Sequence, residues 1–344
     1  MGRQTVRPIN KKVDRMLSEL AISYLFLGGA GAGALFLLTV LDLRSPWASL
    51  APLYSAAGSG RRGKPRETQA FLPQQTYQGL FGAGYGAGLV ALGLGALCLI
   101  ADLGRIDRLV LLFLHPTGSL VSLGTYALAV LLLCGAVLAS LWLFCRRPLR
   151  CWIVRVVQAT TLALSVLVML YTGLLFQNMG TGLLIGSFIV PVLFVLSSIS
   201  TGSAVLLIAF LFTRKAQGFR GMCGQLLRVD CVVIALELVA TLALAVQALL
   251  TPAFAQAVQA LTQGFGAMPF WIGFVVCGLA IPFVLEALKW RRDRIRPLRN
   301  SRNSNQEAFV VIAALVLVGG FSLRWCVAVV GLPVFNVTLS LIGG

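Results

Sequence analysis

Long apolar segments alternate with short polar connections along the chain. Eight of these segments reach the length of about 20 apolar residues that a helix needs to cross the hydrocarbon core of a bilayer. The fifth contains Pro191, so we expect a kink or a tilt in that helix. The pattern predicts an all-α, polytopic membrane protein. The eight predicted spans are residues 21–41, 79–101, 122–144, 154–176, 184–211, 231–250, 270–288 and 308–332.

The composition excludes a soluble protein. Hydrophobic residues make up 58% of the 344 residues and charged residues 11%, and the mean hydropathy is +0.90. Soluble domains contain about 45–50% apolar and about 25% charged residues, so a soluble fold could not bury this much apolar surface. Disordered, collagen-like and coiled-coil chains are excluded as well, because they need more charge, a Gly-X-Y repeat or heptads.

Basic residues are distributed unevenly between the two sides of the predicted membrane domain. The connections after spans one, three, five and seven contain most of the 28 lysine and arginine residues. By the positive-inside rule these connections are cytoplasmic, so both termini are predicted to be extracytoplasmic in a bacterial or archaeal cell membrane. The net charge of +17 is then explained by topology and by attraction to anionic lipid headgroups, without a nucleic-acid partner.

The basic N-terminal segment, residues 1–20, lies on the extracytoplasmic side in this topology. Its basic residues allow two interpretations. The segment is either a solvated tail or a docking strip for an acidic partner subunit.

Cysteine and histidine limit the redox chemistry of the chain. The eight cysteines form no C-x-x-C pair, so we expect no iron–sulfur cluster on this chain. His115 is the single histidine, which excludes a bis-histidyl haem and a histidine-rich zinc site. An electron carrier would have to be held by non-covalent contacts.

Glycines recur four residues apart in the first two spans, as in the pairs Gly29/Gly33 and Gly82/Gly86. Small residues at this spacing let the backbones of membrane helices approach closely. A nucleotide-binding glycine loop would need a preceding strand, and the pattern predicts none. We therefore interpret these glycines as helix-packing positions.

Polar residues gather near one membrane face, at the predicted extracytoplasmic rim. The acidic and basic cluster after span two is either a helix end with local ion pairs or part of a binding site. Tyr171 is either a residue of the aromatic belt or a ligand contact. The candidate site residues at this rim are Glu19, Asp102, Arg105, Arg108, His115, Tyr171, Gln177 and Arg324.

Glu237 lies six residues into the sixth predicted span, counted from the cytoplasmic side. A carboxylate inside a membrane is a candidate proton carrier. A structural pair with a cytoplasmic arginine is an equally good explanation of this residue, and the sequence does not separate the two.

A lipid-soluble quinone suits these constraints. It enters from the bilayer and needs hydrogen-bond donors for its two carbonyl oxygens and a route for protons, which tyrosine, histidine and carboxyl groups supply. A transporter for a small solute or an ion would use the same kinds of residue, often with broken helices near the midplane. Composition alone does not decide between these functions.

Several motifs, in the same order along nearly the whole chain, resemble those of the NrfD/PsrC type of membrane subunit, as in polysulfide reductase. Each is weak alone, and the collinear set is fairly specific. The motifs are the glycine-rich stretch 24–33, the acidic–basic stretch 99–108, the stretches 112–116 and 171–175, the serine-rich stretch 191–202, and the stretch 319–324 that ends at Arg324.

The resemblance implies two four-helix bundles, at residues 21–176 and 184–332, joined by a linker at 177–183 and followed by a tail at 333–344. It also implies a quinone site near the extracytoplasmic face of the first bundle, with menaquinone as the expected quinone. A ferredoxin-like iron–sulfur subunit and a molybdopterin catalytic subunit are the implied partners.

The resemblance assigns roles to several residues. Asp102, Arg105 and Arg108 match the acidic–basic motif of the family, and Tyr171 matches a tyrosine that approaches the quinone. Ser23 stands near a quinone-binding histidine of some relatives, so Glu19 or His115 would replace that group.

The leading hypothesis is therefore a quinone-reactive anchor subunit that exchanges electrons between the quinone pool and the iron–sulfur partner. In it, Arg324 stabilises negative charge on the headgroup or on a carboxylate. The alternatives are the transporter and a passive membrane anchor without quinone chemistry.

Overall fold

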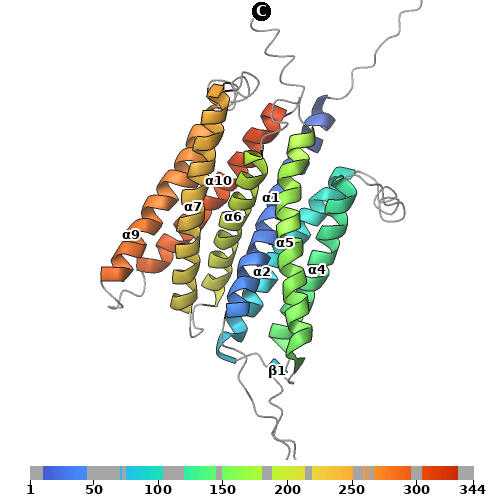
Figure 1. Cartoon of the computed structure of the whole chain (residues 1–344), viewed down its shortest axis with the longest axis vertical. Coiled ribbons are helices and arrows are strands. Elements are labelled where there is room, and N and C mark those ends of the chain that lie inside the picture. The colour runs from blue at the N-terminus through green and yellow to red at the C-terminus, as the bar shows by residue number, and fades with distance from the viewer. Residues whose placement is uncertain are drawn as a thin grey trace, which may run out of the picture.

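The computed structural model of the chain describes residues 11–44, 70–71, 75–103, 120–144, 149–179, 188–213, 219–250, 259, 262, 267–295 and 304–331. Long helices standing side by side form nearly all of this part of the chain (Figure 1). The helices are α1 (Lys11–Arg44), α2 (Gln75–Leu103), α4 (Leu120–Phe144), α5 (Cys151–Met179), α6 (Ile189–Phe212), α7 (Phe219–Leu250), η1 (Pro269–Ala280), α9 (Ile281–Ile295) and α10 (Ser304–Gly331).

Eight helical stretches in the described residues are long and apolar enough to cross a membrane. They confirm the predicted all-α, eight-span membrane fold, and η1 and α9 together form the seventh span. The N-terminal end of α1 and the C-terminal end of α10 lie at the same end of the molecule (Figure 1). The spans are Leu20–Leu43, Tyr77–Asp102, Ser122–Phe144, Trp152–Leu175, Ile189–Phe212, Gly221–Gln247, Pro269–Arg291 and Glu307–Ala328.

The kink or tilt predicted for the fifth span stays a prediction, but Pro191 interrupts no hydrogen bond of the helix. Helix α6 begins at Ile189, which places Pro191 in its first turn. The amide nitrogens of a first turn have no carbonyl partner within the helix, so a proline there removes no hydrogen bond. The predicted start of the fifth span, residue 184, lies outside the described residues.

The sixth span begins earlier than the apolar pattern indicates, because α7 extends through charged residues. It starts at Gly221, ten residues before the predicted start, and it includes Arg228 and Asp230. Arg228 is exposed, and its Nε donates a hydrogen bond to the Gly224 carbonyl oxygen one turn earlier. Asp230 is buried on the inner side. Glu237 therefore lies sixteen residues into its span, near the middle of the membrane, and the predicted depth of six residues is wrong.

The seventh span contains a π-helix that the sequence pattern did not reveal. Residues Pro269–Ala280 form η1, and the Ile281 amide donates to the Val276 carbonyl oxygen, five residues earlier. Pro282 then follows in the first turn of α9. Because proline has no amide hydrogen, it cannot make the regular hydrogen bond where the π-helix ends. π-Helical segments are uncommon and occur frequently at functional sites.

Helices α1 and α6 form the centre of the molecule. In each of their spans 67% of the most apolar window is buried inside the protein, against 28% to 50% in the other six spans. Helix α1 contacts α2, α5 and α6, and α6 also contacts α7 and α10. The division into two four-helix bundles remains a prediction, because α1 and α6 join the two halves closely. We call α1, α2, α4 and α5 the N-terminal half and the remaining helices the C-terminal half.

Glycines permit the closest helix crossings. A Cβ atom at Gly33 of α1 would overlap the backbone of Ser198 in α6, and one at Gly202 would overlap the backbone of Gly33. Gly278 of η1 and Gly319 of α10 meet in the same way. The packing interpretation holds for these positions, as it does for Gly82, but Gly86 has nothing within 4 Å of its Cβ position.

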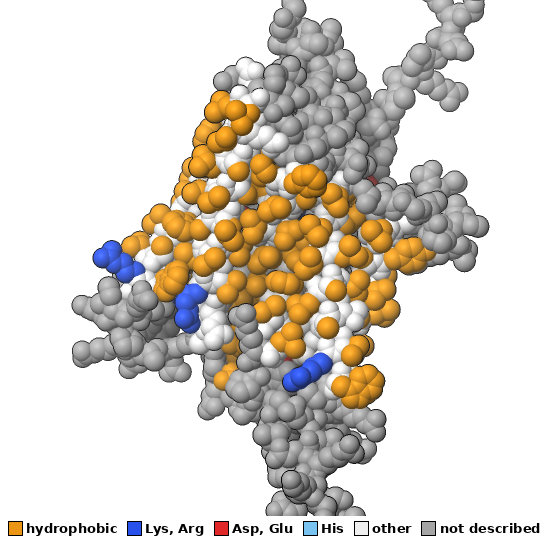
Figure 2. Space-filling view, in the orientation of Figure 1, with side chains coloured by type: hydrophobic (Ala, Val, Ile, Leu, Met, Phe, Trp, Pro, Cys, Tyr) orange, Lys and Arg blue, Asp and Glu red, His pale blue; other side chains and the backbone are white. Residues whose placement is uncertain are grey.

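The surface of the molecule has the apolar middle that a membrane protein needs. On the face that Figure 2 shows, hydrophobic side chains cover the middle of the molecule, and the few described lysine and arginine side chains in view lie toward the end opposite the termini. At that end two short strands, β1 (Ala70–Phe71) and β2 (Leu149–Arg150), pair in antiparallel fashion. They tie the connection between the first two spans to the start of α5.

Candidate functional site

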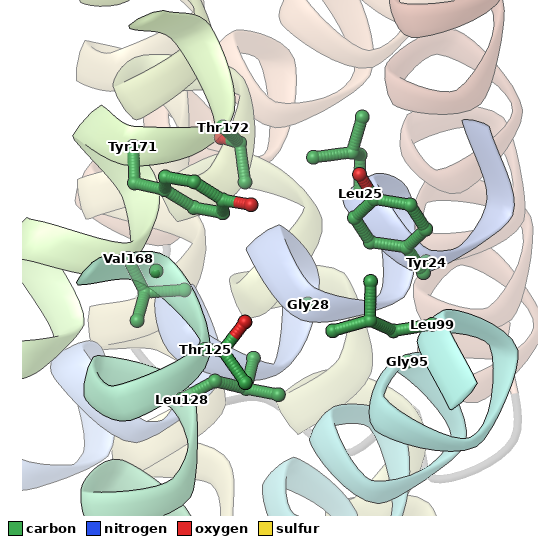
Figure 3. Close-up of a pocket in the computed structure, with 11 residues that line it drawn as sticks. Tyr24, Leu25, Gly28, Gly95, Leu99, Thr125, Leu128, Val168, Tyr171 and Thr172 are labelled. Atoms are coloured by element: carbon green, nitrogen blue, oxygen red, sulfur yellow. The ribbon is translucent and has the colours of Figure 1, made fainter. Parts of the chain in front are cut away.

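A pocket lies between α1, α2, α4 and α5, at the end of the molecule where α1 begins (Figure 3). Its empty volume is about 330 Å³. Apolar side chains and three glycines, Gly28, Gly95 and Gly124, form most of the wall. Hydroxyl groups are supplied by Tyr24, Thr125, Tyr171 and Thr172. Such a site combines an apolar enclosure with a few hydrogen-bonding groups, as small-molecule sites do.

Tyr24 and Tyr171 are the central polar pair of this pocket. Each lies four residues inside its span, and both are therefore at the same depth from the same face. Their side chains are within hydrogen-bonding reach of each other. Tyr171 packs with Leu25 and Leu175 and is only 8% exposed. An aromatic-belt residue would face the lipid, so the buried position favours the ligand-contact interpretation of Tyr171.

Backbone glycines make room for the two tyrosines. A Cβ atom at Gly124 of α4 would overlap the ring of Tyr171. A Cβ atom at Gly95 of α2 would come within 2.8 Å of the Gly28 nitrogen. Helices α1 and α2 therefore approach closely behind the pocket, while α4 leaves the space that the Tyr171 ring fills.

Only part of the predicted rim cluster can be placed. Asp102, the last residue of the second span, is half-buried and close enough to Tyr24 for its charge to act on the tyrosine hydroxyl. Glu19 and Gln177 lie in α1 and α5, but their side chains are outside the described structure. The remaining three predicted residues, Arg105, Arg108 and His115, fall outside the described residues.

Arg324 lies elsewhere than predicted, on the other side of α1 from the pocket. Its side chain is fully buried at the junction of the two halves. Nη2 donates to Ser198 Oγ at 2.8 Å, and Nη1 donates to the Gly320 carbonyl oxygen at 2.9 Å and to Ser197 Oγ at 3.4 Å. Gly29 leaves the space for this guanidinium. Glu237 lies near enough for its charge to act on this guanidinium. The two predicted roles of Arg324, at the headgroup or at a carboxylate, remain predictions.

A second polar group, at the opposite end of the N-terminal half, was not predicted. Asp42 of α1 accepts hydrogen bonds through Oδ2 from the Gln158 amide at 2.8 Å, the Tyr85 hydroxyl at 3.0 Å and the Trp142 indole at 3.2 Å. These donors come from α5, α2 and α4, respectively. One carboxylate thus ties together all four helices of the N-terminal half. The described residues contain no group of three acidic, cysteine or histidine side chains arranged to hold a metal ion.

Sequence reasoning missed Tyr24 as a site residue, although a signal was present. Tyr24 enters the membrane on the same face as Tyr171 leaves it, and both positions are the same distance from the ends of their spans. Comparing the depths of polar residues at the same membrane face would have identified Tyr24 as a neighbour of Tyr171. No comparable signal pointed to Thr125 or Thr172, because hydroxyl residues are common in membrane helices and satisfy their hydrogen bonds locally. Thr172 does so by donating to the Met169 carbonyl oxygen.

The fold and the pocket define a multi-span membrane protein with a hydroxyl-lined site near one face. Comparison with known proteins gives the family. The family model described as polysulphide reductase, NrfD, matches residues 16–336, and the protein belongs to this family. A curated relative is the C subunit of polysulfide reductase from Wolinella succinogenes, which is 28% identical over 336 residues, covering 90% of this protein and 92% of the relative.

Proposed function

We propose that the protein is the quinone-reactive membrane subunit of a respiratory oxidoreductase complex. Its pocket would bind the headgroup of a lipid-soluble quinone, with menaquinone as the expected quinone. The observation that carries the proposal is the Tyr24–Tyr171 pair, two hydroxyl groups within reach of each other in an otherwise apolar pocket near one membrane face.

The chemistry of the lining fits a quinone. A quinone headgroup is a flat, apolar ring with two carbonyl oxygens that accept hydrogen bonds, and a quinol has hydroxyls that also donate. Tyrosine hydroxyls both donate and accept, so they suit both forms. Leu25, Leu99 and Val168 supply apolar wall around them. When bound, the quinone supplies the electron chemistry.

The residues of the protein would then bind and orient the headgroup and move its protons. Tyr171 is held in place by Gly124 and Leu175, so its hydroxyl is a fixed donor. The Tyr24 hydroxyl lies within hydrogen-bonding reach of Tyr171, and the charge of Asp102 acts on Tyr24. Because Asp102 ends its span at the membrane face, it would exchange protons between the pocket and the aqueous phase.

Electrons would pass to partner subunits of the complex. The name of the Wolinella relative identifies that protein as one subunit of a reductase with several subunits. For the present protein we propose a ferredoxin-like iron–sulfur subunit and a molybdopterin catalytic subunit, bound at the face near the pocket. Both termini would be extracytoplasmic, as the basic connections predict, and labelling of single cysteines introduced near residue 3 and residue 340 from either side of intact cells tests this topology.

The central experiment is the substitution Tyr171→Phe in the native complex. It removes one hydroxyl and keeps the ring that packs on Gly124, so assembly should be retained. We expect quinol oxidation to fall by about 10²-fold, the lower range for loss of one positioned proton-transfer group, together with weaker binding of a quinone analogue. Tyr77→Phe is the matched control, since Tyr77 begins its span at the opposite face.

Unchanged quinol oxidation in Tyr171→Phe would remove this residue from the site. If the wild-type complex itself binds no quinone analogue, the protein acts as a passive anchor. Uptake of a solute by the isolated protein in liposomes, without any partner, would instead support the transporter alternative.

A further inference from the structure

Three buried carboxyl groups lie in the C-terminal half, away from the pocket described above. We call Asp230, Glu237 and Glu286 the carboxyl line; they are 1%, 3% and 1% exposed, respectively. Asp230 and Glu237 are seven residues apart on α7, which is about 10 Å along the helix axis. Carboxyl groups inside a membrane are costly to bury and usually functional.

The carboxyl line begins with a pair. Asp230 and Glu286 of α9 are within hydrogen-bonding reach of each other, on the side of the molecule where α7 starts and α9 ends. Two carboxyl groups this close in an apolar interior repel each other when both are charged, so such a pair is suited to take up and release a proton. No described group makes a hydrogen bond of regular geometry to the oxygens of either residue.

Glu237 lines a separate cavity in the middle of the span. The cavity is small, with room for about one water molecule, and α6 contributes Ser197, Ser200 and Thr201 to its wall. Oε1 of Glu237 is buried and has no hydrogen-bond partner among the described groups. A polar cavity of this kind takes up water, because an unpaired buried carboxyl oxygen is expensive and each water offers donors to it.

Hydroxyl groups on α6 connect the pair to the cavity. Asp230 lies within reach of Ser200 and Ser203, and Ser200 also lines the cavity. Ser203 and Thr201 donate their own hydrogens to backbone carbonyls of α6, so their oxygen lone pairs remain available to accept hydrogen bonds from water. From Ser203 to Ser197 this row spans about 9 Å along the helix.

The row ends at Arg324, beside the quinone pocket. Ser197 accepts a hydrogen bond from Arg324, whose charge acts on Glu237. Gly29, which makes room for the guanidinium, directly follows Gly28, which lines the pocket. The backbone of α1 at these two glycines therefore lies between the two sites. Among the described residues, the other titratable groups near the carboxyl line are Cys223, Cys231 and Lys289.

We propose that Asp230, Glu286 and Glu237, joined by water in the cavity, form a proton path from the face at the start of α7 to the middle of the membrane. In each transfer a proton leaves the Asp230–Glu286 pair through water and binds to a carboxylate oxygen of Glu237. Glu237 then releases this proton through the cavity water toward the side where Arg324 lies and becomes a carboxylate again, and a proton from the aqueous face restores the pair. The path itself does not depend on the proposed function; only the use of its protons at the quinone pocket rests on it.

Infrared spectroscopy of the native complex tests the path directly. The carbonyl stretch of a protonated carboxyl group shifts when its hydrogen is replaced by deuterium. We expect the carboxyl bands of the wild-type complex to shift within seconds after transfer to deuterated buffer, and part of this signal to be absent in Glu237→Gln. Glu307→Gln is the matched control, because Glu307 is exposed in the first turn of α10, and it should leave the buried bands unchanged. If the carboxyl bands of the wild-type complex do not shift over hours in deuterated buffer, this result alone overturns the proposal.

Proton uptake gives the second readout. With the complex in liposomes and a pH indicator on the side where α7 starts, Glu237→Gln should slow proton uptake during quinone reduction by about tenfold or more. Glu237→Asp, which keeps the acid, should restore most of the rate. Binding of a quinone analogue should be the same in the wild type and in both Glu237 variants. If the wild-type complex binds no analogue, the proposed function fails, whereas the proton path is still tested by the infrared experiment. Unchanged uptake in Glu237→Gln, or uptake that requires sodium ions, would overturn the proposal.

Discussion

The ring of Tyr171 occupies the space that any side chain at Gly124 would need. The two residues come from adjacent helices, α5 and α4, and their contact limits the directions in which the tyrosine hydroxyl can point. A glycine in the middle of a helix costs about 0.5–1 kcal/mol relative to alanine. The fixed orientation of one phenol ring explains why the helix accepts this cost here.

Gly124→Ala tests this relationship. The added methyl group should push the Tyr171 ring out of position, destabilise the protein by about 1–3 kcal/mol as overpacking does, and weaken binding of a quinone analogue. Thermal unfolding of the purified complex and analogue titration measure the two effects. Gly93→Ala is the control, because nothing lies within 4 Å of that Cβ position. Equal behaviour of the two variants would mean that the ring is not held by position 124.

The two tyrosines should act as a unit. In a double-mutant cycle with Tyr24→Phe and Tyr171→Phe, the effects on analogue affinity should not add, with a coupling energy of about 0.5–3 kcal/mol, the range for residues in contact. The reason is that either substitution removes the hydroxyl–hydroxyl interaction. Additive effects would show that the hydroxyls contact the ligand independently.

Arg324→Lys should be strongly disruptive, although it keeps the charge. The guanidinium distributes its hydrogen bonds between two nitrogens, with Ser198 on Nη2 and Gly320 on Nη1. A lysine ammonium cannot reproduce this geometry, and loss of a hydrogen bond to a charged group costs about 1.5–3 kcal/mol. We expect a lower unfolding temperature in detergent. Arg291→Lys, at an exposed position, should leave the unfolding temperature within error of the wild type.

The sequence was sufficient for the fold, because the apolar length of a span is a strong physical constraint. Six of the eight spans start and end within about four residues of the predicted positions, as membrane thickness requires. The largest error arose where polar residues lie inside a helix. Asp230 was predicted to lie in a connection between spans, yet its side chain faces the protein interior. The average hydropathy of a segment does not show which way a single side chain faces.

The candidate site was predictable only in part. Tyr171 was found because it carries a family motif and a polar group near a helix end. Its partner Tyr24 and the neighbour Gly124 depend on which helices are adjacent, and a sequence pattern does not give helix order. Arg324 was assigned to the same rim by its depth and by the family-like stretch that it ends, and neither reveals that α1 separates it from the pocket.

Substitution of Asp42 should lower the stability of the protein without changing its affinity for a quinone analogue. Asp42→Ala removes the acceptor of three buried donors, on Tyr85, Trp142 and Gln158. Leaving a buried donor unsatisfied costs about 1–3 kcal/mol, so the variant should lose at least this much stability and form the complex poorly. Tyr85→Phe removes one donor together with its hydrogen bond, and it should cost only about 1 kcal/mol.

Analogue affinity of the folded Asp42→Ala fraction should nevertheless be close to that of the wild type. Asp42 follows Tyr24 by eighteen residues of α1, which places it about 27 Å away along the helix axis. Thermal unfolding and analogue titration on the same sample distinguish the two effects. A folded variant that no longer binds the analogue would place the ligand site, or a coupled second site, at the end of the molecule where β1 and β2 pair, and the Tyr24–Tyr171 pocket would then not be the only site of quinone contact.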